Sequence, residues 1–198
     1  MLEEEYNPPR KLPPHLRPAV SGEPAFSFEV RPATERDIPH MLAIYNHYVL
    51  NSTVTFDEDA LTLTEMRGKF RDVARLKYPW LVAVSPSGQV LGYSYVTPWK
   101  QKAAYRYTVE NSIYLGAAAT GKGIGKALMT RMLDDAKAAG IKEVIAVIAD
   151  KGAEASIAMH ENFGFKQIGH MGKVGFKFGR WLGTVLMQKS LKGGPKRV

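Results

Sequence analysis

The stretch TGKGIGKALM, residues 120–129, constrains the fold most strongly, because three glycines and two lysines separate a strand-like run from a helix-like run. Glycines let backbone N–H groups turn toward an anion, and a helix that starts there adds the positive end of its dipole. A ligand that carries phosphate groups fits such a turn. The alternative is a tight strand-to-helix turn without a ligand.

Residue types at fixed positions exclude two common phosphate-binding loops. With its glycine-lysine pair at Gly125 and Lys126, a P-loop would need glycine at position 120 and a hydroxyl at position 127. The chain has Thr120 and Ala127 there. A dinucleotide-binding loop that begins at Gly121 would need glycine at position 126, which is occupied by lysine.

Composition restricts the class of protein. A chain of 198 residues, 45% of them hydrophobic, favours one domain with a sizeable core. The absence of cysteine excludes disulfides, thiolate metal sites and a cysteine nucleophile. No apolar run approaches the roughly 18 residues of a membrane span, and the acidic start lacks the apolar core of a signal peptide. We therefore expect a soluble, cytoplasmic protein that has no membrane partner.

The net charge of +8 raises the question of nucleic-acid binding. Half of this excess lies near the C-terminus, on Lys189, Lys192, Lys196 and Arg197. The remaining basic residues are spread among acidic ones, without a basic stripe interleaved with aromatic residues. We therefore expect no nucleic-acid partner and interpret the charge as a moderately basic face that attracts an anionic cofactor.

The sequence divides into three parts. These are a proline-rich arm over residues 1–27, a domain over residues 28–191 and a basic tail over residues 192–198 that we expect to be disordered. Hydrophobic periodicity predicts strands over 28–34, 80–85, 90–96, 104–115 and 141–150. It predicts one helix that begins at Glu35 and further helices over 61–76, 126–140 and 156–164. Two final strands are expected on either side of residues 172–181. This order predicts a mixed α/β (α+β) domain with a largely antiparallel first half.

At this point the residues resemble the GNAT superfamily of acetyl-CoA-dependent N-acetyltransferases, and within it the phosphinothricin acetyltransferase family. The matching stretches are IYNHYVLNSTVTF, TPWKQKAAYRYTVENSIYL, GKGIGKALM, VIAVI, SIAMHENFGF and GFKFGRW, in the family's order from about residue 28 to 190. The resemblance implies a single GNAT-like domain whose mixed sheet is splayed at its centre and flanked by helices. It also implies acetyl-CoA as co-substrate, no metal, and a homodimer.

The resemblance implies that acetyl-CoA is held by backbone groups. The pantetheine arm would pair like an added strand with residues 113–115, and the N–H of Leu115 would polarise the acetyl carbonyl. The pyrophosphate would face the glycine loop. The implied cofactor-binding residues are Ile113, Tyr114, Leu115, Thr120, Gly121, Lys122, Gly123, Ile124, Gly125, Lys126 and Ser156.

Glu110 is the candidate general base. A carboxylate inside the apolar strand TVENSIYL is costly without a function or a partner, and burial would raise its pKa toward the useful range. An outward-facing glutamate paired with Arg106 is the alternative. The family places its catalytic glutamate in this segment, which favours the base. His160 and Tyr114 are further candidates for proton transfer, and a purely structural role stays open for each.

The resemblance also implies an acceptor site formed by Phe56, Lys100, Lys102, Tyr105 and Arg106. Its cations could bind the anionic head of an amino acid, although a solvated strand edge is the alternative. The chain departs from the family at three positions: Thr120 replaces glutamine or arginine, Ala153 replaces asparagine and Gly183 replaces aspartate. With Thr120, one side-chain contact to the cofactor phosphates is missing or shortened, and Ala153 cannot donate a hydrogen bond to the pantetheine arm. The role of the carboxylate absent at Gly183 has moved elsewhere or disappeared.

The leading hypothesis is an N-acetyltransferase that acts on the α-amine of a small amino acid or analogue, of the phosphinothricin or methionine sulfoximine and sulfone type. Glu110 would act as base in direct attack within a ternary complex. One alternative acceptor is a polyamine, another antimicrobial or a protein lysine. The alternative class of protein is a non-catalytic module that binds acetyl-CoA.

Overall fold

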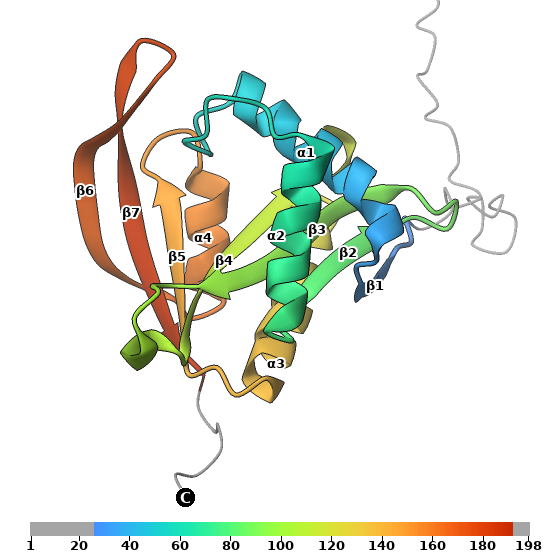
Figure 1. The fold of residues 1–198 in the computed structure, drawn as a ribbon. Helices are drawn as coiled ribbons and strands as arrows, with labels where there is room; N and C mark the ends of the chain where they lie inside the picture. Colours follow the sequence, from blue (N-terminus) through green and yellow to red (C-terminus); the bar gives the residue numbers. More distant parts are fainter. Residues whose placement is uncertain (1–25, 192–198) are drawn as a thin grey trace, which may run out of the picture.

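The computed structural model describes residues 26–191, so residues 1–25 of the predicted arm and the predicted tail at 192–198 lie outside the described residues. The chain forms a seven-stranded sheet in the order β1-β2-β3-β4-β5-β7-β6 (Figure 1). Neighbouring strands are antiparallel except β4 and β5, which are parallel. The strands are β1 (Glu29–Pro32), β2 (Trp80–Val84), β3 (Val90–Pro98), β4 (Thr108–Leu115), β5 (Glu143–Ala149), β6 (Lys166–Lys177) and β7 (Arg180–Ser190).

Helices cover both faces of the sheet. They are α1 (Ile38–Asn51), α2 (Leu63–Arg75), α3 (Ile124–Ala138) and α4 (Glu154–Asn162). On one face, α1 and α2 share a hydrophobic core with β2 and β3 that includes Met41, Val73 and Tyr93. On the other face, α3 and α4 pack over a second core that includes Leu128 and Met187. The predicted mixed α/β fold is confirmed. No helix between residues 26 and 191 is long and apolar enough to cross a membrane.

The first helix begins where predicted, with a short 3-10 turn (Glu35–Asp37) that leads into α1. The carboxylate of Asp37 accepts hydrogen bonds from the N–H and the hydroxyl of Thr34, at 2.7 and 2.9 Å. Arg31 of β1 donates two more at 2.8 Å, and its guanidinium lowers the pKa of Asp37 to about 2. Thr34 and Asp37 thus cap the start of the helix, and the ion pair fixes β1 to the start of α1.

Two predicted strand boundaries were wrong. The strand expected over 104–115 begins only at Thr108, because residues 103–105 form a 3-10 turn whose Ala103 carbonyl accepts a hydrogen bond from Arg106. The segment 172–181, expected between two strands, belongs mostly to them. Only Phe178 and Gly179 form the turn, both with positive φ, as a two-residue type I′ hairpin requires. A register shift between Met171 and Gly175 includes Lys173, whose φ is 55°.

Gly183 of β7 leaves room for a carboxylate from the neighbouring strand. A Cβ at position 183 would lie 2.3 Å from Oδ2 of Asp150, so a side chain cannot be added without displacing Asp150. Asp150 follows β5, accepts a hydrogen bond from the Gly183 N–H at 3.1 Å and pairs with His170 of β6 at 3.0 Å. The space beside Gly183 is therefore filled by the carboxylate of the residue that follows β5.

The sheet splays at its centre. β4 and β5 pair only from Thr108 with Glu143 to Glu110 with Ile145, although both strands continue beyond that point. Figure 1 shows the two strands diverging, with α4 beside the opening. The predicted central splay is confirmed, and it leaves part of β4 without a partner strand on one side.

Candidate active site

A cavity of about 560 Å³ occupies the gap between β4 and β5. Its walls are residues 111–115 of β4, residues 146–148 of β5, the start of α3 and one side of α4. Tyr48 of α1 and Val54 close the remaining side. Nine of the predicted cofactor-binding residues line this cavity, namely Ile113, Tyr114, Leu115, Thr120, Gly121, Gly123, Gly125, Lys126 and Ser156.

Backbone groups of β4 face this gap without a strand partner. Gly116 donates to the carbonyl of Leu91 at 2.8 Å, so by the alternation of an antiparallel ladder residues 112 and 114 also pair with β3. The backbone groups of Ile113 and Leu115 and the carbonyl of Asn111 therefore turn toward the gap, whereas the Asn111 N–H completes the pairing of Glu110 with Ile145. The hydroxyl of Tyr48 donates to the Leu115 carbonyl at 2.7 Å, which leaves the Leu115 N–H as the free group at the end of the edge.

The glycine loop forms an anion-binding helix start. Gly121 and Gly123 have φ of 73° and 79°, and Gly123 is the residue from which α3 begins. The first intrahelical bond runs from Ala127 to Gly123, so the N–H groups of residues 124–126 have no helical partner. A Cβ at Gly125 would lie 3.3 Å from Sδ of Met159, so this third glycine lets α3 approach α4 closely.

The remaining two cofactor candidates lie outside the cavity lining. The Ile124 side chain is fully buried in the core, although its N–H belongs to the helix start. Lys122 extends along the surface with Nζ 4.4 Å from the centre of the Phe26 ring. Of the departures from the family pattern, Ala153 is buried and lines the cavity, and Thr120 directs its hydroxyl to the Ala117 carbonyl at 3.3 Å.

Glu110 lies at the vertex of the splay, as the last residue of β4 that pairs with β5. It shares a face of the sheet with Thr97 of β3 and with Ser112 and Tyr114 of β4, because side chains alternate along the strand. Burial raises the pKa of Glu110, and the nearby charge of Lys100 offsets this only in part. A carboxyl whose pKa is raised by burial is suited to accept a proton near neutral pH.

His160 lies on α4 and is buried, 4% exposed. Its Nδ1 is 2.7 Å from the Ser156 carbonyl and its Nε2 is 3.0 Å from Nδ2 of Asn111. Burial lowers the pKa of His160, which favours the neutral ring. Both ring nitrogens are therefore occupied within the protein.

Tyr114 points into the aromatic core under α1 and α2. Its ring lies 5.2 Å from that of Tyr45, 5.6 Å from that of Tyr48 and 5.4 Å from that of Tyr93. Burial raises the pKa of Tyr114 well above its usual value, so the phenol stays protonated at neutral pH. Core packing and proton donation are both compatible with this position.

The predicted acceptor residues each have their own neighbours in the fold. Lys100 lies over the Trp99 ring at 4.6 Å, with its charge close enough to act on Glu110. Lys102 and Tyr105 are exposed on the 3-10 turn, and Arg106 stacks on Tyr107 at 4.7 Å. Phe56 packs over Gly175 of β6, where a Cβ would lie 2.5 Å from the ring.

Lys177 holds the loop that carries Phe56. It is 1% exposed, and its Nζ donates to the carbonyls of Ser52 and Thr55, both at 2.9 Å. Asp57, at the end of the same loop, accepts a hydrogen bond from the Tyr45 hydroxyl. The loop over residues 52–57 is thus tied to α1 and to the tip of the β6-β7 hairpin.

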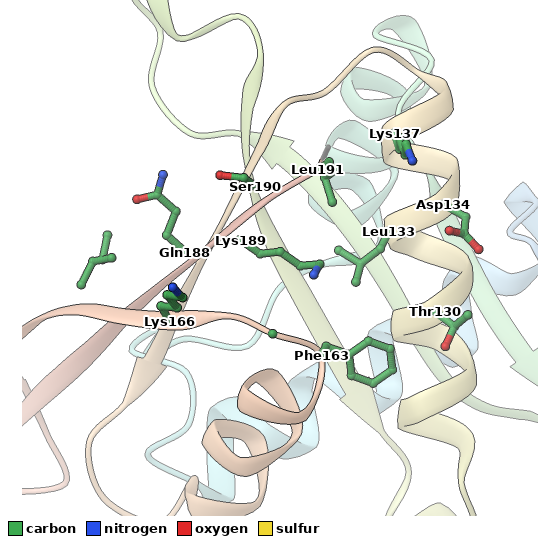
Figure 2. Close-up of a pocket in the computed structure, with 12 residues that line it drawn as sticks. Thr130, Leu133, Asp134, Lys137, Phe163, Lys166, Gln188, Lys189, Ser190 and Leu191 are labelled. Atoms are coloured by element: carbon green, nitrogen blue, oxygen red, sulfur yellow. The ribbon is translucent and has the colours of Figure 1, made fainter. Parts of the chain in front are cut away.

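A second, larger hollow of about 750 Å³ lies between α3, the end of α4 and β7, as Figure 2 shows. Its walls include Leu133, Phe163 and Lys189. None of the residues predicted for catalysis or binding lines it. The cavity in the splay, with the glycine loop and β4 around it, is therefore the candidate active site.

Sequence reasoning missed Tyr48, Asn111 and Lys177. Tyr48 and Asn111 lie within two of the quoted family stretches, but nothing in their spacing shows that they face the splay. A lysine among glycines and aromatic residues resembles an exposed turn residue. Only the folded chain brings Lys177 to the carbonyls of a loop more than 100 residues away.

Comparison with known proteins identifies this class of site. Residues 30–186 match the model of the acetyltransferase (GNAT) domain. The chain therefore belongs to the GNAT superfamily of N-acetyltransferases, and it is an enzyme of this acetyl-CoA-dependent type.

Two relatives of known activity and one solved structure resemble the chain over most of its length. The chain is 39% identical over 165 residues to a phosphinothricin N-acetyltransferase of Alcaligenes faecalis, covering 83% of each chain. It is 39% identical to an L-methionine sulfoximine/L-methionine sulfone acetyltransferase of Pseudomonas aeruginosa, covering 83% of this chain and 95% of the relative. A phosphinothricin acetyltransferase from Sinorhizobium meliloti, solved in complex with acetyl-CoA, superimposes with a TM-score of 0.80 at 40% identity, covering 84% of this chain and 90% of that one.

We predict that Lys177→Met lowers the free energy of unfolding by about 1 to 3 kcal/mol, because two carbonyls lose their donor in a buried setting. Denaturant unfolding measures the loss. The matched control is Lys166→Met, at the exposed start of β6, for which we expect a change within about 0.5 kcal/mol. Equal effects of the two substitutions would show that Lys177 does not hold the loop.

Proposed function

We propose that this enzyme acetylates the α-amine of a small amino acid or analogue, of the phosphinothricin or methionine sulfoximine and sulfone type. The proposal depends on the position of Glu110, which is half-buried, has a raised pKa and lies at the vertex of the splay. The free edge of β4 runs from this vertex to the Leu115 N–H. The named activities of the relatives at 39% identity supply the acceptor class.

The free edge of β4 and the glycine loop fit acetyl-CoA. The Asn111 carbonyl and the backbone groups of Ile113 and Leu115 offer the ladder that an extended amide arm needs, and the start of α3 offers N–H groups for a pyrophosphate. When bound, acetyl-CoA supplies the acetyl group as a thioester. The Leu115 N–H is the donor suited to the carbonyl oxygen, where negative charge develops during attack.

Glu110 removes the proton from the acceptor's ammonium group, directly or through a water molecule. The acceptor amine would lie beside Glu110 at the vertex of the splay. Tyr114, protonated at neutral pH, is a candidate proton donor to the leaving sulfur. Lys100 is the cation whose charge acts on the pKa of Glu110, and it is suited to bind a carboxylate of the acceptor.

The acceptor is tested by thiol release from acetyl-CoA against a panel of amines. The panel contains phosphinothricin, methionine sulfoximine and sulfone, ordinary amino acids, polyamines and a lysine peptide. We expect the highest kcat/KM with the first three compounds. Release only with polyamines or the peptide would overturn the acceptor assignment, and binding of acetyl-CoA without release on any amine would favour a non-catalytic module.

We predict that Glu110→Gln lowers kcat at least about tenfold and leaves the Kd for acetyl-CoA nearly unchanged. The raised pKa of Glu110 also predicts how the stability of the protein changes with pH. The ionised carboxyl is disfavoured in the folded protein, so stability is lost as pH rises through the folded pKa. Glu110→Gln should therefore unfold at a higher temperature than the parent at pH 8, and this gain should vanish below about pH 4.

The control for this prediction is Glu29→Gln, an exposed strand glutamate on β1, which should change neither quantity. Turnover and thermal unfolding at both pH values provide the measurements. An unchanged kcat in Glu110→Gln would remove Glu110 from the mechanism, whatever its effect on stability.

We also propose a homodimer. Large apolar side chains are 41 to 59% exposed on the β6-β7 hairpin, namely Ile168, Met171, Val174, Phe176, Phe178 and Trp181. A patch of this kind on one hairpin suits burial against a second copy. We predict a dimer mass in sedimentation at micromolar concentration and a shift toward monomer in Trp181→Glu. A monomer at all concentrations would contradict the proposal.

A further inference from the structure

Asn111 is the first residue of β4 beyond the point where pairing with β5 ends. Its side chain is 7% exposed and lies on the face of β4 toward α4, opposite in direction to Glu110. Its carboxamide Nδ2 lies 3.0 Å from Nε2 of His160. The contact joins β4 to α4 across the gap, where the two strands have no backbone pairing.

The protons of this contact can be assigned from the partners. Nδ1 of His160 lies 2.7 Å from the Ser156 carbonyl, which can only accept, so Nδ1 carries a proton. Burial among Phe165 and the residues of α4 lowers the pKa of His160, so Nε2 carries none and accepts. The carboxamide of Asn111 must then direct its NH₂ group toward His160, which fixes where its oxygen points.

The oxygen that results has no partner. Among residues 26–191, Oδ1 of Asn111 is one of four buried side-chain atoms without a hydrogen bond, and of those four residues only Asn111 lines the cavity. A buried oxygen left unbonded costs free energy, and a donor from a bound ligand would recover it. The arm of acetyl-CoA carries two secondary amides, each with one N–H.

We propose that Asn111 binds the arm of the co-substrate, accepting a hydrogen bond at Oδ1 from one of its amide N–H groups, while Nδ2 holds His160 in place. This inference rests on the proposed function, because it requires acetyl-CoA in the splay. It makes His160 a positioning residue. With Nδ1 bonded to Ser156 and Nε2 bonded to Asn111, His160 supports the wall of the cavity and does not protonate the leaving sulfur.

Calorimetry with three variants and two ligands tests the binding role. Asn111→Leu removes both hydrogen bonds, Asn111→Asp keeps an acceptor, and Thr184→Val removes a buried, unbonded hydroxyl that does not line the cavity. The ligands are coenzyme A and adenosine 3′,5′-bisphosphate, which lacks the arm. We expect Asn111→Leu to raise the Kd for coenzyme A roughly threefold to tenfold, which corresponds to one hydrogen bond. The Kd for the bisphosphate should stay unchanged.

Outcomes for the two ligands separate the possibilities. Equal weakening of both ligands by Asn111→Leu, or no weakening of coenzyme A beyond that in Thr184→Val, would overturn the inference. If Asn111→Leu does not fold, Asn111→Asp decides: retained affinity for coenzyme A supports the acceptor role, and a loss as large as tenfold contradicts it. Failure of the parent enzyme to bind coenzyme A would instead overturn the proposed function.

Nitrogen NMR of the free enzyme tests the positioning role without any ligand. We expect His160 to show the neutral Nδ1–H form at pH 7 in the parent. In Asn111→Asp a carboxylate faces Nε2, so we expect both ring nitrogens to be protonated there. A neutral Nε2–H form in the parent, or an unchanged spectrum in Asn111→Asp, would contradict the assignment.

Discussion

The rest of the site depends on the early end of one strand pairing. β4 and β5 separate after Glu110 and Ile145, and the free backbone edge, the cavity and the position of the candidate base all follow from that separation. A fully paired parallel ladder would satisfy every backbone group here and leave no room for a ligand. Because unpaired N–H and C=O groups are costly when buried, the gap is best explained as a place for an extended polar arm.

Buried polar contacts stabilise the walls around this gap. Lys177 bonds two loop carbonyls, the Tyr48 hydroxyl bonds the Leu115 carbonyl, and Asn111 bonds His160 across the gap. In a low-dielectric interior each of these contacts is costly to break, since the group left behind finds no water. They therefore define the width of the cavity and the position of the covering loop more firmly than apolar packing alone would.

The carboxylate at the end of β5 bears on one departure of the chain from the family pattern. The family resemblance implies aspartate at position 183, and the sequence left open whether the role of that carboxylate had moved elsewhere or disappeared. Asp150 instead occupies the space that a side chain at position 183 would fill, bonded to the Gly183 N–H and paired with His170. A carboxylate beside β7 is therefore supplied by the residue that follows β5.

The sequence by itself determined the order of helices and strands, the glycine-rich start of α3 and the family, because periodicity, glycine and short motifs act over local distances. It failed at residues 104–107 and 172–181, where a 3-10 turn and a two-residue hairpin turn depend on local bonds that periodicity does not reveal. Only the tertiary structure decided that Asn111 faces His160, that Lys177 is buried and that Arg106 stacks on Tyr107. These contacts join residues that are distant in sequence, or they depend on which face of a strand meets a neighbour. The spacing of residues in a single sequence reveals neither property.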